Sequence, residues 1–184
     1  MKKLVVLVAL VALLLATACA LSPTPTPTPE PGTLTYSNSE HGFSVGYPKD
    51  WAVQEEFMGT IVMFVGPVEE ETGGAINVNI GAAESAEVPA VTLEEYVRLF
   101  KLRVAEAAEN YEELDEYDAV VDDLAAIVWT WKEDLEGNTL TLVVTMAVFV
   151  KENVVYKVAY LSTSESHDEY LDSFELVLST FKFD

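Results

Sequence analysis

The chain has 184 residues and a formal net charge of -21, from 10 basic and 31 acidic side chains. Half of the residues are hydrophobic, which excludes a disordered protein, and about 150 residues remain for folding once a distinct N-terminal segment is set aside, enough for one domain. Binding to nucleic acid depends on Lys and Arg side chains that replace counterions, so this charge argues against a nucleic-acid partner.

Residues 1–19, MKKLVVLVALVALLLATAC, have the pattern of a bacterial lipoprotein signal segment. The apolar run is about 12 residues long, too short for the ~20 that span a bilayer as a helix. Small residues at 16–18 resemble the lipobox, in which Cys19 is lipidated (a palmitate-type anchor) and becomes the new N-terminus. The alternative is an ordinary cleavage site that releases a soluble protein. Cys19 is the only cysteine, so no disulfide can form and lipid attachment is its evident use.

Residues 20–32 alternate Pro with Thr and predict an extended polyproline-II linker. At ~3.1 Å per residue, this linker would hold the domain up to ~40 Å from the membrane. The expected location is therefore the extracytoplasmic side of the cell membrane, in the periplasm or at the cell surface, with the membrane as a partner through the lipid anchor. Without Lys2 and Lys3, the exported chain carries a charge of -23.

Residues 33–184 predict one globular domain that begins with short strands. These are expected around Leu34 and Tyr36 and at 42–47, 51–54, 60–65 and 75–80, with a loop at 70–74. Phe43, Val45 and Tyr47 should point inward. A capping box of Thr92 and Glu95 then predicts a helix.

The second half of the domain predicts a three-stranded antiparallel meander. Its strands are expected at 124–131, 139–150 and 154–161, with turns at 136–138 and 152–153. Both faces of the middle strand are apolar, so both should be covered. Ser166 and Glu169 predict a second capping box and a closing helix. The predicted fold class is α+β, a mostly antiparallel sheet sandwiched between helices.

Candidate catalytic residues are few. Gly42 to Gly46 match the G-x-S-x-G motif of serine hydrolases at Ser44, but that motif needs a strand-to-helix turn, and here the strand pattern continues through the serine. The only histidines, His41 and His167, show no triad order. The domain is therefore expected to be non-enzymatic. The alternative is an envelope hydrolase that uses carboxylates in a cleft.

Metal and cofactor binding also find little support in the sequence. Two separated histidines and one lipidated cysteine exclude a structural zinc site. Nine carboxylates lie between Glu106 and Asp123, without the spacing of a calcium loop. A solvated charged edge explains them, while a cationic partner or weak calcium binding stays open. We expect no cofactor.

Trp129 and Trp131 share one face of their predicted strand with Ile127. They could form a ligand or partner face, such as a stacking platform for a sugar or a lipid. Aromatic side chains at strand spacing more often pack against a covering helix, and this core position is the favoured interpretation.

Three segments resemble one known family. They are Tyr36-Ser-Asn-Ser-Glu-His-Gly-Phe-Ser-Val-Gly-Tyr-Pro-Lys-Asp-Trp51, the helix start Thr92-Leu-Glu-Glu-Tyr, and Ser179-Thr-Phe-Lys-Phe183. The chain is similar to the PsbP-like group over about residues 34–183, a group that includes the extrinsic photosystem II protein and LpqN-type bacterial lipoproteins. The resemblance implies an α/β/α sandwich used as a non-enzymatic binding or assembly module. We therefore expect a monomeric, membrane-tethered module with an envelope protein partner, for which the acidic surface would favour a cationic one.

Overall fold

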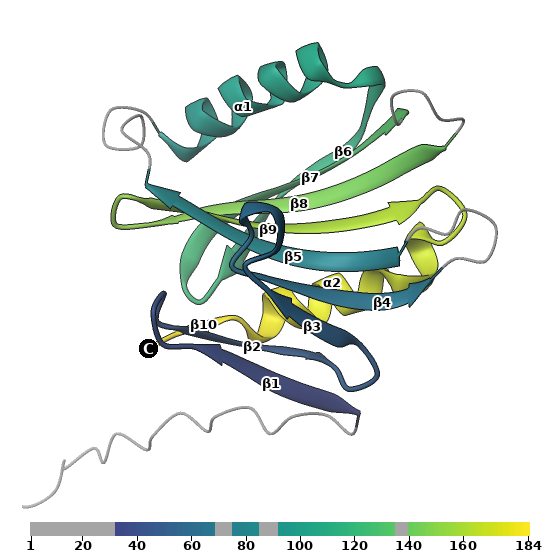
Figure 1. Cartoon of the computed structure of the whole chain (residues 1–184). Coiled ribbons are helices and arrows are strands. Elements are labelled where there is room, and N and C mark those ends of the chain that lie inside the picture. The colour runs from purple at the N-terminus through teal and green to yellow at the C-terminus, as the bar shows by residue number, and fades with distance from the viewer. Residues whose placement is uncertain (1–31, 69–74, 85–91, 135–139) are drawn as a thin grey trace, which may run out of the picture.

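The computed structural model describes residues 32–68, 75–84, 92–134 and 140–184, which form two antiparallel sheets and two α-helices. Helix α1 (Leu93–Ala107) lies on one face of the larger sheet. Helix α2 (His167–Thr180) lies on the other face, beside the smaller sheet (Figure 1). The predicted α+β sandwich around an antiparallel sheet is confirmed.

The larger sheet has seven strands in the order β3-β4-β5-β9-β8-β7-β6. They are β3 (Ala52–Glu55), β4 (Val62–Val68), β5 (Ala75–Glu84), β6 (Glu109–Val121), β7 (Leu124–Asp134), β8 (Thr141–Lys151) and β9 (Val154–Thr163). The predicted meander corresponds to β7, β8 and β9, and it extends into β6 on one side and β5 on the other.

Strand β6 has no counterpart among the predicted elements. It has 13 residues, most of them exposed, and it forms an edge of the larger sheet. Apolar alternation identifies a strand with one buried face, and an edge strand this exposed has almost none. Because its side chains are mostly exposed carboxylates, β6 has no apolar alternation from which it could be predicted.

The principal core lies between the two sheets and α2. The smaller sheet has the order β1-β2-β10, formed by β1 (Thr33–Asn38), β2 (Phe43–Pro48) and β10 (Lys182–Phe183). Phe43 is fully buried and Val45 nearly so, as their alternation predicts. Phe181 follows α2 and stacks on Phe43 with a centroid distance of 5.0 Å. The C-terminus thereby joins the first strands of the domain.

A second core lies under α1 and confirms that both faces of β8 are covered. Val144 and Val148 point to α1, whereas Ala147 and Phe149 point to the principal core. Tyr96 is one of two buried side chains that α1 contributes. Helix α1 therefore covers β7, β8 and part of β9 rather than the whole sheet (Figure 1).

The two predicted capping boxes differ in outcome. Thr92 Oγ1 accepts a hydrogen bond from Glu95 N at 3.3 Å, but the Glu95 carboxylate binds Arg98 instead of reaching back. The prediction for Ser166 is wrong, because its hydroxyl makes no cap and pairs with the Thr163 hydroxyl at 3.0 Å. Both hydroxyls are in buried residues, and a buried polar group needs a partner.

Several predicted features lie outside the described residues. They are the signal segment with Cys19, residues 20–31 of the linker, the loop at 70–74 and the turn at 136–138. Across the described ranges, no helix is both long and apolar enough to cross a membrane.

Candidate binding cleft

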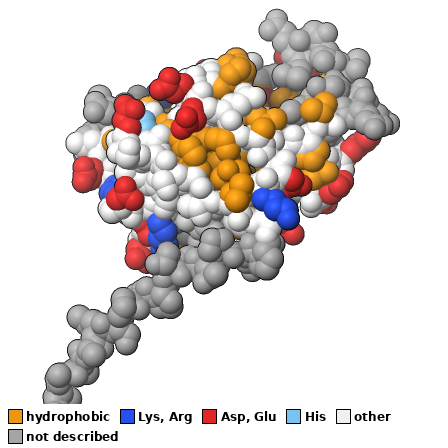
Figure 2. Space-filling view, turned by 60° about the horizontal axis from the view of Figure 1, so that its bottom comes forward, with side chains coloured by type: hydrophobic (Ala, Val, Ile, Leu, Met, Phe, Trp, Pro, Cys, Tyr) orange, Lys and Arg blue, Asp and Glu red, His pale blue; other side chains and the backbone are white. Residues whose placement is uncertain are grey.

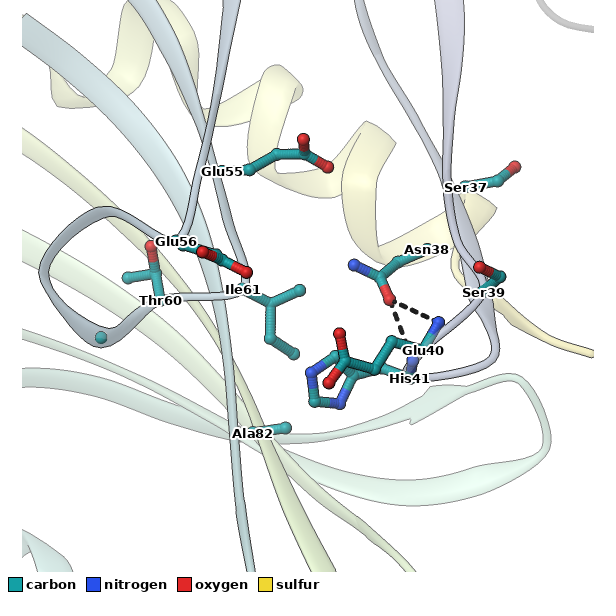
Figure 3. A pocket seen from close by; sticks show the side chains of 11 residues that line it. Ser37, Asn38, Ser39, Glu40, His41, Glu55, Glu56, Thr60, Ile61 and Ala82 are labelled. Atoms are coloured by element: carbon teal, nitrogen blue, oxygen red, sulfur yellow. Dashed lines mark hydrogen bonds between the residues drawn. The ribbon is translucent and has the colours of Figure 1, made fainter.

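An open cleft of about 690 Å³ lies between the turn that joins β1 to β2 and the turn that joins β3 to β4 (Figure 3). Its floor includes Ala82 of β5, on the side of the sheet that faces the principal core. The other residues that line it are Ser37, Asn38, Ser39, Glu40, His41, Glu55, Glu56, Gly59, Thr60 and Ile61.

The β1–β2 turn is organised by Asn38. Its Oδ1 accepts hydrogen bonds from Glu40 N at 3.1 Å and His41 N at 2.9 Å. This Asx-type arrangement fixes the turn without a long loop. Gly42 follows with φ +60°, a left-handed conformation that suits glycine. The wall that carries Glu40 and His41 is therefore ordered by local bonds.

The β3–β4 turn holds a strained backbone. Glu56 and Met58 have positive φ values of 54° and 51°, a region that non-glycine residues rarely occupy. The turn is fixed from both ends, because Glu56 N donates to Ile61 O at 3.1 Å and Ile61 N donates to Ile80 O at 2.8 Å. Backbone strain of this kind costs of order 1–3 kcal/mol per residue and clusters at functional sites.

Tyr36 joins the two walls of the cleft. Its Oη donates to Glu55 Oε1 at 2.7 Å and accepts from Asn38 Nδ2 at 3.0 Å. Burial raises the pKa of Tyr36, as does the Glu55 carboxylate, although the hydrogen bond from Asn38 acts in the opposite sense. The phenol therefore keeps its proton and can hold Glu55 in place.

Exposed apolar side chains border this cleft. Phe57 and Met58 lie in the strained turn with 46% and 87% of their surfaces exposed. Leu34 of β1 and Val53 of β3 are also exposed, on the strands that lead into the two turns. The lower face of the molecule shows hydrophobic side chains gathered in a central strip, with acidic side chains on both sides and a basic side chain at one end (Figure 2). A surface of this composition suits contact with another molecule.

The chemistry of the cleft is acidic and polar. Glu40, Glu55 and Glu56 supply carboxylates, and Asn38 and Thr60 supply an amide and a hydroxyl. Carboxylates attract Lys or Arg side chains through charge-assisted hydrogen bonds. No group of three or more His, Cys, Asp or Glu side chains that could hold a metal ion occurs within the described ranges. The arrangement can therefore receive a cationic group.

The residues considered for hydrolase chemistry do not come together. Ser44 lies within β2, paired with β1 and β10, in extended backbone rather than at a strand-to-helix turn. His41 lines the cleft, while His167 starts α2 and bonds the Thr145 hydroxyl at 2.9 Å. Ser44 thus has the environment of a strand serine.

Trp129 and Trp131 lie in the core under α1. Their exposed fractions are 0% and 4%, and their rings stack with centroids 4.9 Å apart. Phe100 of α1 contacts the Trp129 ring edge to face. Trp129 therefore presents no open stacking platform, whereas Trp131, although nearly buried, lines a second open pocket of about 560 Å³ at the end of α1.

The acidic stretch from Glu106 to Asp123 runs from the end of α1 along β6. Lys101 of α1 bonds both Glu113 and Glu116, and Lys132 of β7 bonds Glu112 at 2.7 Å. The structure thus places these carboxylates along a sheet edge with a few cationic neighbours.

Sequence reasoning missed the cleft. Its walls come from two separate turns of the chain. Glu and Met do not favour positive φ values, so the sequence gives no sign of the conformation at Glu56 and Met58. The run Asn38-Ser-Glu-His-Gly42 was the one available signal, since Asn and Gly mark turns.

Comparison with known proteins agrees with this fold. A family model described as PsbP-like protein matches residues 4–183. LpqN of Mycobacterium tuberculosis, described as involved in cell envelope biogenesis, has 11% identity and a TM-score of 0.59, over 82% of this chain and 89% of its own. PsbP of the cyanobacterium Synechocystis has 14% identity and a TM-score of 0.57, over 83% and 93%.

The Ran-binding protein Mog1p of Saccharomyces cerevisiae also shares the fold. It has 13% identity and a TM-score of 0.53, over 82% of this chain and 95% of its own. No curated protein matches the sequence. At these identities the solved structures establish the fold alone.

Proposed function

The chain belongs to the PsbP-like protein family, and from this premise we propose that it is an extracytoplasmic lipoprotein that binds an envelope protein without catalysing a reaction. The observation that carries the proposal is the acidic cleft with its exposed, strained apolar turn. Phe57 and Met58 would contact an apolar part of the partner, and the carboxylates of Glu55 and Glu56 would pair with its Lys or Arg side chains.

The N-terminal sequence supports the membrane tether. Cys19 follows an apolar segment and small residues, as in lipoprotein signals, and the family match already begins at residue 4. LpqN, which shares the fold, is described as acting in cell envelope biogenesis. Both observations favour an envelope location for this chain.

Three exposed carboxylates outside the cleft are poor candidates for a general acid, which needs a raised pKa so that it carries a proton at neutral pH. Hydrogen bonds, chiefly from Thr92, Arg98 and Thr141, lower the pKa of Glu94, Glu95 and Asp134 respectively.

The cleft is tested by capture of partners from envelope extracts on the full chain, followed by mass spectrometry. We compare the wild type with a Phe57→Ser, Met58→Ser variant. The control is Val120→Ser, which changes an apolar residue on β6 whose exposure lies between those of Phe57 and Met58. We expect a specific protein that the wild type and the control retain and that the double variant loses.

A second variant, Glu55→Gln with Glu56→Gln, should weaken the same capture and reduce its salt dependence. Equal capture by all variants would exclude the cleft as the binding surface. The tether is tested separately, by fractionation and intact mass of the wild type beside Cys19→Ala. A soluble, unacylated wild-type chain would contradict the lipoprotein assignment.

A further inference from the structure

The second pocket lies on the α1 face of the larger sheet, where α1 ends and the chain turns into β6 (Figure 1). Its volume of about 560 Å³ is within the range of ~300–1,000 Å³ that is usual for small-molecule sites. The residues that line it are Val104, Ala107 and Ala108 at the end of α1, Glu109 at the start of β6, and Trp131, Glu133 and Asp134 of β7. The lining therefore combines apolar side chains with carboxylates.

Trp131 gives this pocket an ordered wall. Its ring stacks on the fully buried ring of Trp129, which fixes its position in the core under α1. Trp131 Nε1 donates a hydrogen bond to Glu133 Oε2 at 3.2 Å, since residues two apart in a strand lie on one face. The indole thereby holds the Glu133 carboxylate beside the apolar part of the lining.

Three carboxylates border the pocket without a cationic partner. They belong to Glu109, Glu133 and Asp134, and none of them forms an ion pair with another residue that the structure describes. Lys132 is next to Glu133 in sequence but bonds Glu112 at 2.7 Å. A cation that enters the pocket would therefore meet carboxylates that are free to pair with it.

Asp134 and the end of α1 add to this negative character. Thr141 Oγ1 donates to Asp134 Oδ1 at 2.6 Å, and Asn110 Nδ2 donates to Oδ2 at 2.7 Å. These neutral donors lower the pKa of Asp134 and fix its carboxylate without cancelling the charge. The last carbonyl groups of a helix carry partial negative charge, and the last turn of α1 has no basic residue to offset it. The pocket is thus suited to a positively charged group.

We propose that this pocket binds a small organic ammonium ion, whose charged group pairs with Glu133 and Glu109 and whose apolar part lies against Trp131. An organic cation fits better than a metal ion, because the described residues hold no group of three His, Cys, Asp or Glu side chains that could bind a metal. Apolar side chains beside the carboxylates also match a ligand with both kinds of surface. The pocket shares no lining residue with the cleft, so the proposal does not depend on the protein partner.

The test is a titration of the full chain with benzylammonium, followed by NMR of the Trp131 indole N–H, which bonds Glu133. We expect a saturable shift of this signal and no shift of the Trp51 indole signal, because Trp51 lies in the principal core. Benzyl alcohol and benzoate carry the same ring without the positive charge. Both should bind at least about tenfold more weakly, the loss expected for one charged hydrogen bond.

Two variants, each with a matched control, separate this pocket from the general attraction of cations to an acidic domain. Glu133→Gln keeps an oxygen that can accept the indole hydrogen bond, and it should weaken benzylammonium binding at least about tenfold. Asp118→Asn removes an exposed charge on β6 and should leave binding unchanged. Ala107→Leu adds bulk to the lining without a change of charge and should also weaken binding, whereas Ala105→Leu on the same helix lies outside the lining and should not. The proposal is wrong if benzylammonium does not saturate, if benzyl alcohol or benzoate binds equally well, or if either pocket variant binds like its control.

Discussion

The indole ring of Trp51 lies directly against the backbone of Gly66. A Cβ on residue 66 would lie 2.7 Å from both Cε2 and Cζ2 of the ring, closer than real Cβ contacts occur. Trp51 is buried and immediately precedes edge strand β3, and Gly66 lies in β4 where the register shifts. This contact fastens the start of β3, and thus one wall of the cleft, to the sheet.

Gly66→Ala should therefore destabilise the domain by about 1–3 kcal/mol, the usual cost of overpacking. Gly81→Ala is the matched control, since its added methyl group meets no described atom and restricts the unfolded chain. Urea unfolding followed by circular dichroism measures both. Equal stability of the two variants would show that the Trp51 ring can move away at little cost.

Lys101 should matter more for stability than Lys132. Its side chain is only 16% exposed and bonds both Glu113 and Glu116, whereas the Lys132–Glu112 pair is largely in solvent. Lys101→Met leaves two carboxylates of β6 facing each other without their shared cation, with an expected cost of about 1–2 kcal/mol. Lys132→Met should cost less than about 0.5 kcal/mol. Thermal unfolding at low and high salt would reveal both values, and the Lys101 effect should shrink as salt screens the repulsion.

Asp122 should stabilise the fold at neutral pH and lose that effect in acid. Burial alone would raise its pKa, but hydrogen bonds from Lys182 Nζ at 2.8 Å and Phe183 N at 2.9 Å hold it below its ordinary value of 3.8. The ionised carboxylate therefore contributes stability above about pH 4, and this contribution disappears as pH falls through the lowered pKa.

Asp122→Asn keeps a side chain that tolerates the positive φ of 47° at this position. The wild type should exceed this variant by about 1 kcal/mol at pH 7 and by progressively less below pH 4, in urea unfolding at several pH values. A difference that persists unchanged in strong acid would mean that the charge is not responsible.

The three tryptophans should report a dry environment. Trp51, Trp129 and Trp131 are at most 6% exposed and are the only tryptophans in the chain. We expect blue-shifted native emission and little quenching by iodide, both reversed in urea. Strong iodide quenching of the native protein would show that solvent reaches the indole rings, and would favour the interpretation of Trp129 and Trp131 as a ligand-binding face.

Strands with one or two buried faces were predictable from the sequence. Phe43 and Val45 alternate into the principal core, and the apolar faces of β8 are covered as expected. The division into two sheets was not predictable, because β10 contributes only two residues and pairs Lys182 with Ser44 across most of the domain. No local pattern encodes such a distant pairing.

The candidate cleft was beyond the sequence for a related reason. Its carboxylates come from separate turns, and nothing local predicts that the Tyr36 hydroxyl bonds Glu55. The acidic stretch was evident from the sequence. Its position at a sheet edge was not, because that position depends on the order of the strands, in which β6 pairs only with β7. Composition revealed the charge, and only the topology revealed its position.

The charged edge of β6 has a consequence for crowding. An edge strand of 13 residues could template pairing with a second copy and so start aggregation. Two such edges side by side would set rows of carboxylates against each other, which disfavours the contact at neutral pH. Neighbouring copies concentrated on one surface would thus repel each other, whereas acidification would remove that protection and make self-association easier.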